Sequence, residues 1–418
     1  MLMKRIAAVL ISASLLAGCS SRSEKSVQTL KTGIWRASLA LQNQSLPFNF
    51  EVVKDQAGLY NILIRNAEER LRLDEVKTSG DSVDITLHIF DANIKARIKG
   101  DTLEGVFVKN YEKDYKVPFM AVFGQSYRFE KGTQQDSVPD FSGRYAVDFV
   151  HDADTTVAVG IFKQTGDLVT GTFLTPTGDY RYLEGNVANG IMQLSTFDGN
   201  HAFIFTATKQ GNNTINGHYY SGKTWHESWT GVKDDNATLP DAESLTFLKP
   251  GYERMDIAFP NVNGDTVRLT DEKYKNKVVI LQLFGTWCPN CMDETMYLSP
   301  WFDQNHQRGV EIIGLAFERK PDFAYASGRV KKMIEKLGVK YDFVIAGTND
   351  KAEASTHLPM LNRVVAFPTT IFIGKDGKVK KIHTGFSGPG TGPYYEQFIQ
   401  HFNETVGELL NENPASSL

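Results

Sequence analysis

Two cysteines separated by two residues, Cys288 and Cys291, are the side chains of this sequence best suited to chemistry. They follow an apolar segment, 278–284, that predicts a buried strand, and they precede a segment with helical character. A helix N-terminus stabilises a thiolate, so a C-x-x-C pair in this setting favours thiol–disulfide exchange. We expect Cys288, at an exposed turn, to attack a substrate disulfide. Cys291, one turn further on and more buried, would resolve the mixed disulfide.

Two alternatives to redox chemistry at this pair are a buried, inert pair of thiols and half of a zinc site. Zinc would need two further ligands, and the sequence holds no second C-x-x-C and no H-x-x-x-H. We therefore predict redox chemistry that needs no cofactor and no metal.

The third cysteine, Cys19, ends a segment with the features of a targeting signal. Lys4 and Arg5 precede an apolar stretch, 6–16, which is too short to span a bilayer. The sequence Leu-Ala-Gly-Cys at 16–19 resembles a bacterial lipobox, which implies cleavage after residue 18 and a lipid on Cys19. The alternative is an ordinary secretory signal with an incidental cysteine. An exported protein with one remaining close pair has no disulfide framework, which favours a catalytic pair.

Length and charge limit the number of domains and the kinds of partner that the chain is expected to have. A chain of 418 residues is long enough for two or three domains. Its formal net charge of −4 leaves no basic surface of the kind that nucleic-acid binding requires, so no nucleic-acid partner is predicted.

The first half of the chain predicts short strands separated by Gly, Asp and Asn turns. Similar segments open at 32–37 and 142–147, and a glycine-containing strand recurs at 103–107 and 215–219. With about eight strand candidates in each half, we predict two β-rich repeats, 32–130 and 140–233, as tandem antiparallel barrels or sandwiches. The alternative is one irregular β-sandwich. We refer to 32–233 as the β-rich region.

We expect a tether at 19–31 before the β-rich region and a polar linker at 234–251 after it. Beyond the linker, strands alternate with helices. We refer to the predicted domain at 252–411 as the α/β region, and expect a mixed central sheet flanked by helices. We expect 412–418 to be a disordered tail. The expected elements are strands at 278–284, 311–317 and 341–346, a hairpin at 368–373 and 378–383, and helices at 291–306, 322–337 and 394–410.

The α/β region resembles the TlpA/ResA-like family, the membrane-associated thioredoxin-like reductases of bacterial envelopes. One matching segment is 277–291, which contains Trp-Cys-Pro-Asn-Cys, and is followed by Glu294. The other is 367–377, which begins Phe-Pro-Thr-Thr and matches the family's cis-proline loop and hairpin. The resemblance covers about 258–410 and leaves out the β-rich region.

The resemblance implies roles for several residues. Pro368 would be the cis-proline that faces the cysteines. Glu318, at the end of a strand, would lie near the active site and shuttle the proton of Cys291; the alternative is a surface glutamate. Substrate-binding positions would be Trp287, Pro289, Phe367 and Thr369.

Three positions bear on how closely the chain follows the pattern. Gln282 stands where thioredoxin carries a buried aspartate, which makes Glu318 a more interesting candidate. Met296 replaces the proline that the family's helix usually carries, so we expect a straighter helix. The bulky Phe367 precedes the cis-proline, where it would tune redox poise and substrate fit.

Together these features predict a lipid-anchored, periplasm-facing thiol–disulfide oxidoreductase of the bacterial cell envelope that reduces exported proteins. Its partners would be a disulfide-containing envelope protein, a membrane-bound electron donor, and the membrane itself through Cys19. The residue after Cys19 is Ser20 and not an acidic residue that would signal retention, so an outer-membrane location of the lipid anchor is plausible if the host has such a membrane.

Two alternatives to this function stay open. A peroxiredoxin-like peroxidase would need Pro-x-x-x-Thr/Ser-x-x-Cys, whereas this chain has Gln-Leu-Phe-Gly-Thr at 282–286. The second is an envelope binding protein in which the β-rich region binds a ligand or protein and the α/β region senses redox state.

Overall fold

The computed structural model describes residues 28–87, 89–130 and 138–412. The predicted signal peptide at 1–18, Cys19 and the tail at 413–418 lie outside the described residues. Among the helices of the described part, none is both long enough and apolar enough to cross a membrane.

The first part of the described chain forms a nine-stranded antiparallel sheet in which β1 pairs with both β2 and the last strand, β9. The edges of this sheet are β4 and β5. Its strands are β1 (Gly33–Leu41), β2 (Gln44–Lys54), β3 (Tyr60–Asn66), β4 (Glu69–Leu73), β5 (Val76–Ser79), β6 (Ser82–Leu87), β7 (Ala92–Lys99), β8 (Thr102–Lys109) and β9 (Lys116–Phe123).

A second nine-stranded sheet follows in the described residues, and its pairing of β11 with β12 closes it into a barrel. As in the first sheet, the first strand pairs with the last, here β10 with β18. Its strands are β10 (Gly143–His151), β11 (Asp154–Thr165), β12 (Leu168–Thr175), β13 (Gly178–Asp179), β14 (Leu183–Ala188), β15 (Ile191–Phe197), β16 (Ala202–Gln210), β17 (Thr214–Ser221) and β18 (Trp225–Lys233).

The two sheets are structural repeats, as the recurring segments predicted. Gly105 of β8 and Gly217 of β17 occupy equivalent places in the next-to-last strand of each sheet. A Cβ at Gly105 would overlap the carbonyl oxygen of Lys95 on the neighbouring strand, and a Cβ at Gly217 would overlap that of Thr206. Glycine is therefore required at both places by close approach of the neighbouring backbone. The prediction of tandem barrel-like sheets is confirmed, while the exact repeat boundaries remain predictions.

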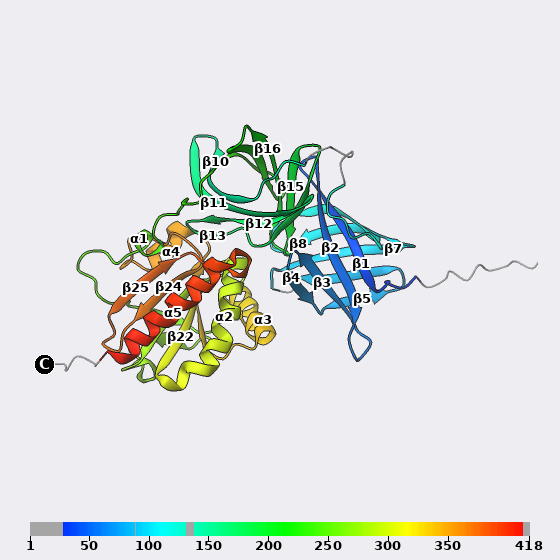
Figure 1. The fold of residues 1–418 in the computed structure, drawn as a ribbon. Coiled ribbons are helices and arrows are strands. Elements are labelled where there is room, and N and C mark those ends of the chain that lie inside the picture. The colour runs from blue at the N-terminus through cyan, green and yellow to red at the C-terminus, as the bar shows by residue number, and fades with distance from the viewer. Residues whose placement is uncertain (1–27, 88, 131–137, 413–418) are drawn as a thin grey trace, which may run out of the picture.

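The α/β region contains a five-stranded mixed sheet in the order β23-β22-β21-β24-β25, with the first three strands parallel. The predicted mixed sheet flanked by helices is confirmed (Figure 1). The remaining elements are α1 (Ala242–Leu245), β19 (Ala258–Pro260), β20 (Thr266–Arg268), η1 (Glu272–Tyr274), β21 (Val278–Phe284), α2 (Pro289–Asn305), η2 (His306–Arg308), β22 (Val310–Glu318), α3 (Phe323–Leu337), β23 (Asp342–Thr348), α4 (Lys351–His357), β24 (Thr369–Ile373), β25 (Val379–Thr384), η3 (Pro389–Thr391) and α5 (Pro393–Asn411).

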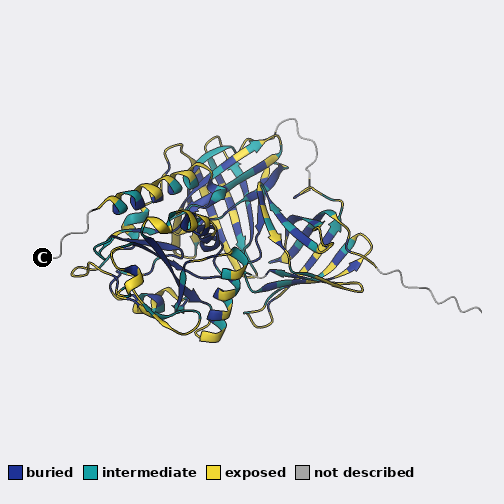
Figure 2. Ribbon diagram, turned by 90° about the horizontal axis from the view of Figure 1, so that it is seen from below, coloured by how far each residue is buried: buried dark blue, intermediate teal, exposed yellow. Residues whose placement is uncertain are grey.

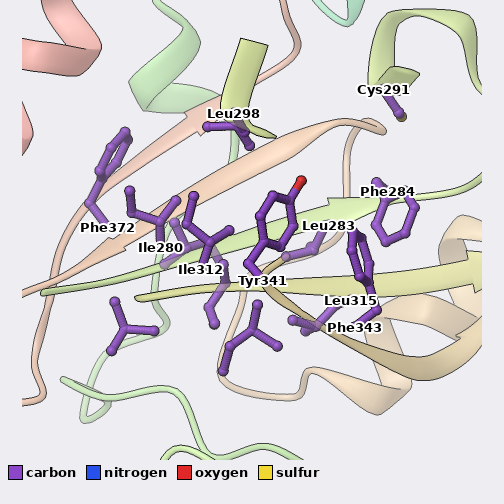
Figure 3. Close-up of a cluster of buried hydrophobic side chains, with 14 of the residues drawn as sticks. Ile280, Leu283, Phe284, Cys291, Leu298, Ile312, Leu315, Tyr341, Phe343 and Phe372 are labelled. Carbon is purple, nitrogen blue, oxygen red and sulfur yellow. The ribbon is translucent and has the colours of Figure 1, made fainter. Parts of the chain in front are cut away.

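The core of the α/β region is built on β21 and β22, whose residues are all buried. This explains why their sequences are mostly apolar and do not alternate, because a parallel strand is covered on both faces. Helices α2 and α5 pack together through the rings of Tyr297, Trp301 and Phe402. Figure 2 shows the buried strands beside helices with exposed outer faces, and Figure 3 places Cys291 near Phe284 at one end of the core.

Candidate active site

The cysteine pair lies at the N-terminus of α2. Cys288 is the N-cap residue, and Pro289 occupies the first turn of the helix, where a missing N–H costs nothing. Cys288 and Cys291 are joined as a disulfide, and the backbone N–H of Cys291 lies 3.2 Å from the Sγ of Cys288. In the reduced protein the same N–H is placed to donate to a Cys288 thiolate, which stabilises the charged form.

The loop before Cys288 is tightly built. A Cβ at Gly285 would overlap the ring of Trp287 and would lie 2.7 Å from the carbonyl oxygen of Phe317. The indole N–H of Trp287 donates to the same Phe317 carbonyl at 2.8 Å. These contacts tie the loop to the end of β22 and fix where Cys288 enters the helix.

Both cysteines are buried: the exposed fraction is 5% for Cys288 and 0% for Cys291. The prediction that Cys291 is the more buried is confirmed, but the prediction of an exposed turn at Cys288 is wrong. The physical reason is that the β-rich region covers this turn. The amide of Asn290, between the two cysteines, donates to the Asp179 carboxylate at 3.1 Å and to the Asp179 carbonyl at 3.3 Å.

The β-rich region also reaches the other side of the pair. The guanidinium of Arg319, just after β22, donates to Asn200 at 3.1 Å. It stacks 3.9 Å from the ring centre of Tyr111 and lies 5.3 Å from that of Trp287. Residues from both repeats therefore surround the cysteine-bearing turn.

The second predicted segment meets the first at Cys288. The Phe367–Pro368 peptide bond is cis, as the family resemblance implied. The Sγ of Cys288 lies 3.4 Å from the carbonyl oxygen of Phe367, and the Phe367 ring lies edge-on to Trp287 at 5.7 Å. The carbonyl of Pro368 accepts a hydrogen bond from the N–H of Gly385 at 2.9 Å.

The predicted substrate-binding residues are less accessible than expected. Trp287 is half-buried, and Pro289 and Phe367 are buried beside the cysteines. Thr369 has no exposed surface, and its hydroxyl donates to the carbonyl of Ala366 at 2.8 Å. The structure brings the first three together at the cysteine pair, whereas the side chain of Thr369 points into the protein; their substrate-binding roles remain predictions.

Glu318 is buried, so the surface alternative for this residue is wrong. Its carboxylate accepts from the N–H of Thr286 at 2.8 Å and from the Thr286 hydroxyl at 2.9 Å. Burial raises the pKa of Glu318, and the hydrogen bonds from Thr286 oppose that shift. This geometry holds the loop that leads to Cys288; a proton-shuttle role for Glu318 remains a prediction.

A second buried acid, Glu294, lies one helical turn after Cys291, and the sequence patterns predicted no role for it. Its carboxylate accepts from the amide of Gln282 at 2.8 Å and from the hydroxyl of Thr370 at 2.5 Å. Burial raises the pKa of Glu294 to about 7, although these hydrogen bonds oppose the shift. Residues three apart lie on the same face of a helix, so Glu294 shares a face with Cys291. This spacing is the feature of the sequence that could have pointed to Glu294.

The site offers no cluster for a metal ion: within the described residues, no three His, Cys, Asp or Glu side chains are grouped in a way that could hold one. The groups available for chemistry at this turn are the two sulfurs, with Glu294 on the same helix and Glu318 hydrogen-bonded to the loop before Cys288.

Comparison with known proteins places this geometry in a family. The family model described as Redoxin matches residues 235–399. Thiol-disulfide oxidoreductase ResA of Geobacillus thermodenitrificans is 31% identical over 140 residues, which are 34% of this chain and 72% of that protein. The chain belongs to the ResA-like thiol–disulfide oxidoreductases.

A second ResA relative agrees with this assignment. ResA of Bacillus subtilis is 27% identical to this ResA-like protein over 150 residues, covering 36% of this chain and 74% of that protein. A solved thiol:disulfide interchange protein of the thioredoxin family from Chlorobium tepidum is 19% identical, covers 38% of this chain and 96% of that chain, and gives a TM-score of 0.30. The Redoxin match and the ResA relatives confirm the family resemblance read from the two motifs, and the protein is a thiol–disulfide oxidoreductase. The β-rich region of this ResA-like protein lies outside the matched Redoxin residues.

Proposed function

We propose that this oxidoreductase reduces disulfide bonds of exported proteins while a lipid on Cys19 tethers it to a cell-envelope membrane. The observation that carries the proposal is the disulfide of Cys288 and Cys291 at the N-terminus of α2, next to the cis Phe367–Pro368 bond. Exchange requires a thiolate, and the N–H groups at a helix N-terminus stabilise one.

The reaction begins from the reduced dithiol. The Cys288 thiolate attacks one sulfur of the substrate disulfide, forms a mixed disulfide and releases the other substrate sulfur as a thiolate. The Cys291 thiolate then attacks the Sγ of Cys288, releases the second substrate thiolate and forms the Cys288–Cys291 disulfide. Two electrons pass to the substrate. The proton of Cys288 passes to buffer or to a released thiolate, and the proton of Cys291 reaches them through a buried acid.

A buried acid assists the second step. Cys291 has no exposed surface, so its proton needs an acceptor inside the protein. Glu294 and Glu318 are the two candidates, and the pKa of about 7 at Glu294 suits a group that accepts a proton near neutral pH.

A membrane-bound donor of two electrons, such as a protein dithiol, would return the pair to its reduced form by the reverse exchange. The lipobox-like segment at 16–19 supports a lipid anchor, and the absence of an acidic residue at Ser20 supports an outer membrane where the host has one. Intact-mass measurement of the exported protein tests the anchor: a lipid-modified N-terminus that Cys19→Ser abolishes is expected, and an unmodified N-terminus would contradict it.

Trapping of the mixed disulfide tests the reaction. Reduced Cys291→Ser protein, mixed with a disulfide-bonded protein substrate, should accumulate a covalent complex through Cys288 that excess dithiol releases. Cys288→Ser protein should accumulate none. Equal trapping by both variants, or by neither, would contradict the assigned order of attack.

A further inference from the structure

Arg181, in the loop between β13 and β14, is a buried cation of the β-rich region that reaches the first turn of α2. Its exposed fraction is 4%. One guanidinium nitrogen donates to the carbonyl of Pro289 at 3.2 Å and also pairs with the carboxylate of Asp293. Pro289 lies between the two cysteines, so this contact joins the second β-sheet directly to the redox pair.

The other guanidinium nitrogens are held within the β-rich region. Nη2 pairs with Glu69 of the first sheet, and Nε lies 3.5 Å from the carboxylate of Asp198, which directly follows β15 of the second. The backbone N–H of Arg181 donates to Asp179 at 2.6 Å. Asp179 in turn accepts from Asn290 and from the N–H of Gly388, at 2.7 Å. One side chain therefore draws together both sheets and the N-terminus of α2.

We propose that Arg181 is a positioning residue of the redox centre: it fixes the first turn of α2, and its positive charge stabilises the thiolate form of Cys288. The inference rests on the proposed role of the Cys288–Cys291 pair and deepens it, because it assigns part of the redox centre to the β-rich region.

The chemical reason lies in the peptide bond between Pro289 and Asn290. A cation that binds a carbonyl oxygen polarises the peptide and makes its N–H a stronger donor. This N–H belongs to Asn290 and lies in the first turn of α2, next to the N–H of Cys291 that lies 3.2 Å from the Sγ of Cys288. The N–H groups of such a turn together stabilise a thiolate. Arg181 therefore acts on the sulfur through the helix as well as by its charge.

The charge balance around Arg181 supports the same conclusion. Burial raises the pKa of Asp293 to about 7, although the Arg181 cation opposes the shift. Burial would also raise the pKa of Asp198, but His201 and Arg181 lower it to about 2. Arg181 therefore opposes protonation of both acids, and His201 contributes to this effect at Asp198. Without it, the cluster becomes either more negative or protonated, and in both cases Cys288 loses a nearby positive charge.

The test compares the reduction equilibria of full-length variants. Each protein is equilibrated at pH 7 with buffers of reduced and oxidised dithiothreitol, and the reduced fraction is measured by thiol alkylation and mass. In Arg181→Met, the equilibrium constant for reduction should fall threefold to tenfold relative to wild type, where tenfold corresponds to about 30 mV for this two-electron couple. Arg181→Lys, which retains the charge, should recover at least half of the loss.

Two further variants separate this effect from a purely structural one. Glu69→Gln removes a carboxylate partner and leaves Arg181 charged, so its equilibrium constant should rise, opposite in sign to Arg181→Met. Lys99→Met removes a cation from an exposed ion pair with Glu104 in the first sheet, and should stay within twofold of wild type.

If the wild-type pair cycles normally but the equilibrium constant for reduction is unchanged in Arg181→Met and Glu69→Gln, the inference about Arg181 is overturned while the proposed function stands. If Arg181→Met does not fold, the equilibrium constants of Arg181→Lys and Glu69→Gln test the inference instead. A smaller constant than wild type in Arg181→Lys and a larger one in Glu69→Gln would support it, and unchanged constants in both would overturn it. A wild-type pair that accepts no electrons would overturn the proposed function and this inference together.

Discussion

The carboxylate of Glu294 accepts a hydrogen bond from the hydroxyl of Thr370 at 2.5 Å. This contact joins α2, three residues after Cys291, to β24, two residues after the cis-proline. Gln282 of β21 donates to the same carboxylate at 2.8 Å. A buried acid is therefore fixed between the two sequence motifs that define the site.

Replacement of Glu294 by Gln should slow the resolving step. At pH 7, we expect the rate at which Cys291 resolves the mixed disulfide and releases the substrate to fall roughly 10- to 100-fold. This is at the lower end of general-base contributions. The wild-type rate should rise through a pKa near 7, and this inflection should disappear in the variant. Single-turnover release of a trapped substrate measures it. Unchanged rates with Glu294→Gln, and a loss with Glu318→Gln, would move the role to Glu318.

The same residue should make stability fall as pH rises. Burial raises the folded-state pKa of Glu294 from 4.5 to about 7, so the folded protein binds more protons than the unfolded chain between these values. Its contribution is present below pH 4.5 and is lost as pH rises through 7, by about 3 kcal/mol. Urea unfolding at pH 5 and pH 8 should therefore differ less in Glu294→Gln than in wild type. The exposed Glu335→Gln should leave the pH dependence as in wild type.

Replacement of Glu318 by Ala should loosen the loop before Cys288. It leaves the buried N–H and hydroxyl of Thr286 without their acceptor, which costs about 1–3 kcal/mol for each unsatisfied group. Thermal or urea unfolding measures the loss. Thr286→Ser retains both donors and is the matched control. Equal stability of Glu318→Ala and wild type would show that the loop is held by other contacts.

Replacement of Asn290 by Ala should expose Cys288. The variant loses both hydrogen bonds to Asp179, which help to hold the β-rich region over the pair. The reduced protein should react severalfold faster with a maleimide at Cys288. Asn403→Ala cuts hydrogen bonds to Tyr297 and Trp301 at the packing of α2 against α5, and should not change this rate. A rate equal to that of wild type would mean that other contacts control access.

Local sequence signals predicted the α/β region well. The run at 278–284, apolar except for Gln282, coincides with β21, because a strand buried on both faces shows no alternation of apolar and polar residues. Helix α3 begins after Asp322, whose carboxylate accepts from the N–H of Tyr325, and ends at Gly338 with a φ of 64°. Capping chemistry of this kind is readable from residue types alone.

Long-range contacts could not be predicted in this way. Asp179 and Asn290 are 111 residues apart, and nothing in either local pattern indicates that they meet. The burial of Cys288 follows from such contacts, and so does the buried cluster around Arg181. Helix α4, at Lys351–His357, was missed because so short a helix carries too little periodicity. The expectation of a straighter α2 overlooked Pro300, which lies inside the helix.

The reduction potential of the Cys288–Cys291 couple tests the proposed reductase most directly. It is measured in the full-length wild-type protein by equilibration against thiol buffers, with Cys288→Ser as the control that forms no internal disulfide. A value near or below about −250 mV, in the range of thioredoxin, is the predicted result. A value near about −120 mV, typical of a strong disulfide oxidant, would contradict the proposed direction of electron flow.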